Sequence, residues 1–124
     1  MDISRIQREF SAAQKTFSVL ELHPTTEGTV YARTALQTGA GTYVLSIRFP
    51  ENYPNEMPRV FVDAPAITRA PHRYQAGHIC YLHPSMWNPG VHNLTFVIAR
   101  AAKWLNKYEV WRNRGTWPGA EIKH

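Results

Sequence analysis

Cysteine is almost absent from this sequence of 124 residues, in which Cys80 is the only one. A single cysteine cannot close an internal disulfide, which excludes a disulfide-stapled secreted scaffold and predicts a cytoplasmic protein whose thiol is either core filler or a reagent. No apolar run approaches the roughly 20 residues of a membrane span. The start, MDISRIQREF, is charged and amphipathic, unlike a signal peptide. We therefore expect no membrane partner.

Long basic runs are also missing, although the chain is basic overall. Lys and Arg number 14 against 9 Asp and Glu, which gives a net charge of +5. This charge permits binding of a nucleic acid or of an acidic protein. Because no run of five basic residues and no nucleic-acid-binding motif is present, a nucleic acid is the weaker hypothesis.

The sequence has no internal repeats, linkers or low-complexity tracts. Its content of 44% apolar and 19% charged residues is typical of a globular protein. A chain of this length buries about two thirds of its surface, which is enough for one core. We therefore expect a single domain over residues 1–124.

The hydrophobic periodicity predicts a helix, four strands, a long loop and a second helix. Asp2 can cap the first helix, and Asn93 can cap a last helix that Gly115 ends. Short turns between consecutive strands favour an antiparallel meander, so the expected fold class is α+β. The apolar stripe of the first helix is Ile3, Ile6, Phe10, Ala13 and Phe17, and the expected strands are residues 17–22, 29–36, 43–49 and 59–63.

Residues 64–92 break this periodicity and hold Cys80 together with four of the six histidines. A long irregular segment in a compact domain is usually functional. Cys80 lies in a histidine-rich loop rather than in an apolar stripe, which favours a functional thiol. His72, His78 and His83 lie eight, two and three positions from it, and any of them could favour the thiolate or hold a proton.

Two other kinds of site remain as alternatives for this loop. Cys80 with its three neighbouring histidines offers four potential zinc ligands. Their spacing is irregular and a second cysteine pair is missing, so we expect neither a metal nor another cofactor. A cysteine hydrolase would need a carboxylate to orient its histidine, and the nearest, Asp63 and Glu56, lie upstream of the loop.

Several motifs occur in a linked order: Tyr53-Pro54-x-x-x-Pro58, then Pro71, then Gly77-x-Ile79-Cys80, and finally Trp87-x-Pro89. Together they resemble the ubiquitin-conjugating enzyme family over most of the chain, from the first helix through Trp111. The resemblance implies that family's fold and its activity. A protein C-terminus would be carried as a thioester on Cys80 and passed to an amine, such as a target lysine.

The chain departs from the family pattern in two ways. His72 stands where the family has the asparagine that supports the loop and stabilises the oxyanion, which implies either that role or general-base catalysis. Only one helix follows the active site, where eukaryotic members commonly have more. This resembles the bacterial branch, found in antiphage CBASS systems in which the conjugating protein acts on a cyclic-nucleotide synthase.

The resemblance also implies partners and contact residues. We expect Ser85, Trp87, Asn88 and Pro89 to form a shallow groove for the transferred tail. Trp87 is more readily explained as a core anchor, and Ser85 and Asn88 equally well as turn formers.

On the basic face of the first helix, Arg5, Arg8 and Lys15 would dock an activating enzyme. The transferred C-terminus would come from a ubiquitin-like protein or from the cyclic-nucleotide synthase. A non-catalytic module that only binds a ubiquitin-like protein is the alternative. The thioester hypothesis requires a Cys80 sulfur that solvent can reach; a sulfur enclosed by packed side chains would contradict it.

Overall fold

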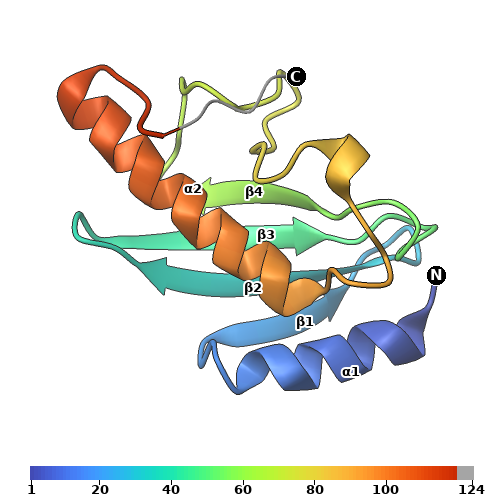
Figure 1. Ribbon diagram of the computed structural model, residues 1–124. Coiled ribbons are helices and arrows are strands. Elements are labelled where there is room, and N and C mark those ends of the chain that lie inside the picture. The colour runs from blue at the N-terminus through green and yellow to red at the C-terminus, as the bar shows by residue number, and fades with distance from the viewer. Residues whose placement is uncertain (120–124) are drawn as a thin grey trace.

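The computed structural model describes residues 1–119 and confirms the α+β class (Figure 1). Helix α1 (Ile3–Gln14) precedes an antiparallel sheet whose strands pair in chain order, as the predicted meander requires. A long loop containing the 3-10 turn η1 (Pro84–Met86) then leads to α2 (Leu94–Arg114). The strands are β1 (Leu20–Pro24), β2 (Val30–Gln37), β3 (Thr42–Arg48) and β4 (Arg59–Ala64).

Both predicted helix caps are confirmed. The Asp2 carboxylate accepts a hydrogen bond from the Arg5 N–H at 3.0 Å, and the Asn93 side chain accepts one from the Phe96 N–H at 2.9 Å. These bonds satisfy N–H groups that have no partner within a helix. Gly115 ends α2 with φ +76°, a left-handed conformation that glycine adopts without a steric penalty.

The strand boundaries differ from the prediction mainly at the first strand. Phe17 was expected to begin it, but the Phe17 N–H donates to the Ala13 carbonyl at 2.8 Å and so continues the turn after α1. Pairing of β1 with β2 starts only at Leu20, which lies opposite Thr34. The apolar residues of the first segment therefore serve the end of a helix and the start of a strand in succession.

One face of the sheet is covered by α2, and α1 lies beside β1 (Figure 1). Leu45 and Ile47 of β3 are fully buried, as are Ile98 and Leu105 of α2. Each such side chain stabilises the fold by about 1.5–3 kcal/mol relative to exposure. Ile3 is 43% exposed, so the buried stripe of α1 begins at Ile6 rather than at Ile3.

The Glu9 carboxylate fixes the start of α2 against α1. Its Oε1 accepts from the Tyr53 hydroxyl at 2.6 Å and from the Leu94 N–H at 2.8 Å, and its Oε2 accepts from Arg5 Nε at 2.6 Å. Burial and the Glu9 carboxylate raise the pKa of Tyr53, which therefore stays a hydrogen-bond donor. A single carboxylate thus links three separate parts of the chain.

Neither helix of the described chain, residues 1–119, is long and apolar enough to cross a membrane.

Candidate active site

The backbone of the loop is held in place on both sides of Cys80. The Ile79 N–H donates to the Val60 carbonyl of β4 at 2.9 Å, and the Cys80 N–H donates to the His72 carbonyl at 2.8 Å. The same His72 carbonyl accepts from Trp104 Nε1 of α2 at 3.1 Å. The loop therefore joins the sheet to α2 where it carries the cysteine.

The cysteine is buried, with 2% of its surface exposed, so the expectation of a solvent-reachable sulfur is wrong for this structure. A cavity of about 20 Å³, room for about one water molecule, lies beside it. The residues that line this cavity, called the Cys80 pocket below, are Cys80, His72, Tyr81, Arg100, Lys103, Trp104, Lys107 and Trp117.

Part of the cover comes from the segment that follows α2. This segment turns back from the helix end toward the loop (Figure 1). The Trp117 ring lies 5.0 Å from the His72 ring and 5.5 Å from the Trp104 ring, measured between centroids. Trp117 is half-buried in this position. No sequence pattern indicates this contact, because tryptophan after a helix end has no required direction.

The environment of the thiol acts on its pKa in opposite directions. Burial raises the pKa of Cys80, and this is the largest effect. The Tyr74 hydroxyl donates to Sγ at 3.6 Å, and Sγ donates to the Leu82 carbonyl at 3.6 Å. The bond accepted from Tyr74 and the positive charge of Arg100 lower the pKa without cancelling the effect of burial. The closed pocket therefore favours the neutral, unreactive thiol.

Of the three histidines predicted to serve Cys80, His72 lines its pocket. Its backbone has φ +54°, in the left-handed region that non-glycine residues seldom adopt. That conformation belongs to the residue whose carbonyl holds the Cys80 N–H. The structure thus brings His72 to the Cys80 pocket, and its catalytic role stays a prediction.

His78 faces a different cavity, of about 360 Å³, whose lining includes Tyr74 but not Cys80. Its ring stacks on Tyr74 at 4.3 Å, and Tyr74 in turn reaches the sulfur. Within residues 1–119 the buried Nδ1 of His78 has no hydrogen-bond partner. Burial, with a smaller effect from Arg59, lowers the pKa of His78. Tyr74 therefore contacts both the His78 ring and the Cys80 sulfur.

His83 caps the η1 turn. Its Nδ1 accepts from the Ser85 N–H at 3.2 Å and lies 2.7 Å from Ser85 Oγ. It does not line the Cys80 pocket, so a role in proton transfer has no geometric support in this structure. Ser85 is exposed and, with His83, forms a local turn.

Residues 1–119 contain no cluster of ligands that would support the zinc alternative. Across residues 1–119, no three His, Cys, Asp or Glu side chains gather where they could hold a metal ion. The loop separates His72, His78 and His83 instead of bringing them together around Cys80.

The segment predicted to form a groove for the substrate tail makes local and core contacts. Trp87 Nε1 donates to the Pro54 carbonyl at 2.8 Å, and its ring packs against the core, which confirms it as an anchor. Asn88 Oδ1 accepts from the Gly90 N–H at 2.9 Å, and the Asn88 N–H donates to His92 Nδ1 at 3.0 Å. Asn88 therefore forms a turn. Its contact with a substrate, like that of Ser85, stays a prediction.

Arg5 differs from the two other residues predicted to dock an activating enzyme. Besides its bond to Glu9, its guanidinium donates to the Pro89 carbonyl at 2.5 Å and to the His92 carbonyl at 3.0 Å. Arg5 therefore holds segments of the fold together rather than offering a free charge for docking. Helical periodicity could not indicate this, because it does not show which other segment the end of a side chain reaches. Arg8 and Lys15 are exposed and border a shallow hollow on α1.

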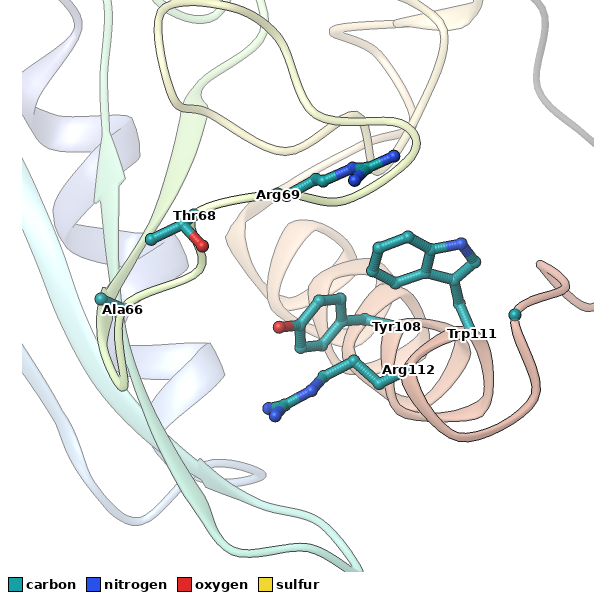
Figure 2. Close-up of a pocket in the computed structure, with 7 residues that line it drawn as sticks. Ala66, Thr68, Arg69, Tyr108, Trp111 and Arg112 are labelled. Atoms are coloured by element: carbon teal, nitrogen blue, oxygen red, sulfur yellow. The ribbon is translucent and has the colours of Figure 1, made fainter.

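A larger cavity, of about 620 Å³, lies between the loop and the end of α2 (Figure 2). Figure 2 shows Arg69 extending from the loop above Trp111, with Arg112 on the other side of Tyr108. None of the residues that line it lines the Cys80 pocket.

Sequence reasoning missed several residues of the Cys80 pocket. Arg100, Lys103 and Lys107 occur at i, i+3 and i+7, a spacing that puts them on one side of a helix. That side could have been recognised, but its position beside Cys80 could not. Tyr74 gave no signal, because nothing in its spacing distinguishes a hydroxyl aimed at sulfur from one in water.

Comparisons with known proteins show the family to which the chain belongs. The family described as Type II CBASS E2 protein matches residues 9–124. The chain is 40% identical over 75 residues to "Probable ubiquitin-conjugating enzyme E2 17" of Arabidopsis thaliana, covering 59% of this chain and 40% of that protein. It is 42% identical over 66 residues to "Ubiquitin-conjugating enzyme 15" of the same plant, covering 52% and 35% respectively. The matches thus span less than half the length of these relatives.

Among solved structures, the fold is similar to one titled "A complex of the Vps23 UEV with ubiquitin". The TM-score is 0.64 at 17% sequence identity, covering 86% of this chain and 85% of that one. At that identity the likeness concerns the fold alone. The match over residues 9–124 carries the assignment: the chain belongs to the family of Type II CBASS E2 proteins, ubiquitin-conjugating-like members of antiphage defence systems.

Proposed function

We propose that this protein is a conjugating-type transferase that carries an acyl group on Cys80. The observation that supports this most is the surroundings of the sulfur. The Tyr74 hydroxyl and the Arg100 charge both favour the thiolate, and His72 lines the same pocket. Family membership and the position of Cys80 in the loop motif agree with it.

The chemistry has two steps. In the first, the Cys80 thiolate attacks the carbonyl carbon of a protein C-terminus that is already held as a thioester. The bond from carbon to Cys80 Sγ forms, the donor's carbon–sulfur bond breaks, and the departing thiolate takes up the proton that Cys80 lost. In the second, an amine attacks the same carbon. The carbon–nitrogen bond forms, the electron pair returns to Sγ, and one proton of the amine replaces the thiol proton.

His72 is the proposed donor to the oxyanion that forms in each step. Its side chain lines the pocket, and an imidazole N–H can donate a hydrogen bond where the family uses an amide. A well-placed donor contributes about 3–4 kcal/mol to stabilisation of the transition state. His78 and His83 do not line this pocket, so we assign the donor role to His72 alone.

The buried sulfur must be uncovered before it can react. Trp117 lies after the last helix, packs on two rings and is half-buried. We propose that it moves away when a donor arrives. Removal of this cover reduces the desolvation that raises the pKa of Cys80, whereas Tyr74 and Arg100 remain in place. Opening the pocket would therefore also activate the thiol.

The partners follow from the same proposal. A ubiquitin-like protein or the cyclic-nucleotide synthase supplies the C-terminus, and a lysine of a target accepts it. Arg8 and Lys15 are exposed on α1 and would dock the activating enzyme.

A synthetic peptide with a C-terminal glycine thioester tests the transferase. We expect intact-mass measurement to show an added acyl group that a reducing thiol removes, at a rate above that of free cysteine with the same peptide. Cys80→Ser should carry no reducible adduct. Loading no faster than free cysteine, in the wild-type chain and in Trp117→Ala, would contradict the proposal.

Two observations favour a second function, that of a non-catalytic module which binds a ubiquitin-like protein. The sulfur is enclosed, and the similar solved structure is of a protein in complex with ubiquitin. Binding that survives Cys80→Ala, with no loading of the wild-type chain, would support this function instead.

A further inference from the structure

Three cationic side chains border the Cys80 pocket from one side of α2. Arg100, Lys103 and Lys107 occupy positions i, i+3 and i+7 of the helix. Lys103 is exposed, and the other two are half-buried beside aromatic rings. We call these three residues the basic rim. They cover about 10 Å along the helix axis, at about 1.5 Å per residue.

The basic rim has no counter-charge within residues 1–119. The ion pairs there join Arg5 to Glu9 and His23 to Glu21, far from the pocket in the sequence. Glu109, the acidic residue of α2, accepts a hydrogen bond from Thr38 instead. No carboxylate from the described chain lines the Cys80 pocket.

The three charges also act on one another. Burial lowers the pKa of Lys107, and Lys103 and Arg100 lower it further. Like charges held together without a partner are destabilising, and solvated lysines at a helix surface avoid this cost by pointing apart. Arg100 is fixed, because its Nε donates to the Tyr81 carbonyl at 3.0 Å. The arrangement therefore suits a bound anion better than bare solvent.

We propose that the basic rim binds acidic side chains in the C-terminal tail of the protein that donates the acyl group. This inference rests on the proposed transferase function and defines its substrate class. An extended tail whose last carbonyl reaches Cys80 passes the pocket mouth. At about 3.3 Å per residue, the rim matches about three residues of such a tail. The favoured donor carries Asp or Glu among the few residues before the reacting carbonyl.

Three peptide thioesters of equal length test this substrate preference. They differ only in whether the three residues before the final glycines are glutamates, serines or lysines, and each carries a neutral N-acetylcysteamine leaving group. We expect the acidic peptide to load Cys80 about tenfold faster than the serine peptide, and the lysine peptide to load most slowly. The preference should shrink at 0.5 M salt, where charges are strongly screened.

A matched pair of variants locates the effect. Lys103→Glu should reduce the preference for the acidic peptide about tenfold. Arg114→Glu makes the same charge change at an exposed position of α2 that lines neither cavity, and it should leave the preference unchanged. Equal loading of the three peptides, or equal effects of the two variants, would overturn the proposal.

Thiol reagents of opposite charge give a readout that needs no thioester. Methanethiosulfonates bearing a sulfonate or a trimethylammonium group form a mixed disulfide with Cys80 and release methanesulfinate. In Trp117→Ala, with rates normalised to free cysteine, we expect the anionic reagent to react about tenfold faster, and Lys103→Glu to remove this difference. Equal normalised rates would overturn the basic rim as an anion site.

The outcomes separate the two proposals. No loading by any peptide, together with a large reagent ratio, would overturn the transferase and with it the proposed substrate, while leaving an anion site beside the thiol. Loading without charge preference would overturn the basic rim alone. Protection of Cys80 by mixed-sequence duplex DNA, with no preference among the peptides, would identify a nucleic acid as the anion and contradict the proposal.

Discussion

Charges are paired differently at the start of α2 and in its middle. At the start, the Glu9 carboxylate of α1 accepts from Arg5, Tyr53 and the Leu94 N–H, so that this half-buried charge is fully paired. Further along the helix, the basic rim has no carboxylate partner within residues 1–119.

The paired charge near the start of α2 serves stability, whereas the unpaired charges of the basic rim suit binding. A half-buried charge that is paired on every side holds segments together. Charges that repel one another without a partner weaken the fold, which suits a site beside a nucleophile that receives an oppositely charged partner. The Glu9 contacts at the start of α2 therefore form a clamp, whereas the basic rim in its middle is the proposed recognition surface.

The largest expected effect is loss of the reaction at Cys80 without loss of the fold that the clamp stabilises. Cys80→Ser should abolish every reducible adduct, because an oxygen ester resists thiols. The midpoint of thermal unfolding should change by only a few degrees, since serine is similar in size and can also donate to the Leu82 carbonyl. Intact mass and calorimetry measure the two quantities. A persisting reducible adduct would place the reaction elsewhere.

The next effect concerns the cover of the pocket. Trp117→Ala should raise the rate of alkylation of Cys80 by iodoacetamide about tenfold or more, because loss of the indole exposes the sulfur. Thr116→Ala, at the exposed neighbouring position, is the control and should react like the wild-type chain. Mass spectrometry over time gives both rates. An unchanged rate in Trp117→Ala would mean that other residues close the pocket.

At the clamp, Glu9→Gln should lower the free energy of unfolding by about 2–3 kcal/mol. Glutamine loses the ion pair and leaves a buried donor short of its acceptor. Glu21→Gln is the matched control: its pair with His23 is exposed, and its loss should cost less than about 0.5 kcal/mol. Urea titration measures both. Similar losses of unfolding free energy in the two variants would mean that the contacts of Glu9 stabilise the fold no more than an exposed ion pair does.

The pH dependence of alkylation tests how burial and the charge of Arg100 act on the pKa of Cys80. Burial holds the pKa of Cys80 above its ordinary value, so the rate should rise with pH and have its midpoint above that of a free cysteine. Trp117→Ala should move the midpoint to lower pH because it reduces desolvation. Arg100→Gln should move it to higher pH because a favourable positive charge is lost. Shifts with the opposite signs would contradict this account.

The smallest effect on stability and loading is expected from substitutions of the exposed basic residues of α1. Arg8→Glu with Lys15→Glu should leave unfolding and loading by peptide thioesters almost unchanged, since both residues are exposed. Loading from an activating enzyme should slow. Arg5→Glu should instead destabilise the chain, because Arg5 bonds to Glu9 and to two carbonyls near α2. Thermal unfolding of the variants distinguishes the two roles, and equal destabilisation would contradict them.

Much of the fold could be predicted because its signals are local. Asp2 and Asn93 cap helices through bonds that span three residues, and Gly115 ends α2 through its own backbone conformation. Alternation along β3 gave its buried face, since neighbouring side chains of a strand point to opposite sides. The start of β1 was misplaced because apolar residues can also end a helix.

The candidate site was predictable in part. The loop motifs led to Cys80 and to His72, which do lie together. The groups that act on the sulfur, Tyr74 and Arg100, come six and twenty positions away in the sequence, and no local pattern indicates that distance. The role of His83 in proton transfer stays a prediction, because His83 is close to Cys80 along the chain but does not line its pocket.

The sequence by itself determined the elements, the family motifs and the single thiol, since these depend on residue type and short spacing. Only the tertiary structure decided that the thiol is enclosed, that Trp117 helps to enclose it, and that three cations of α2 lie at its edge. Enclosure and charge environment are properties of groups that folding brings together across long separations. Their effect on reactivity therefore cannot be read from any one segment.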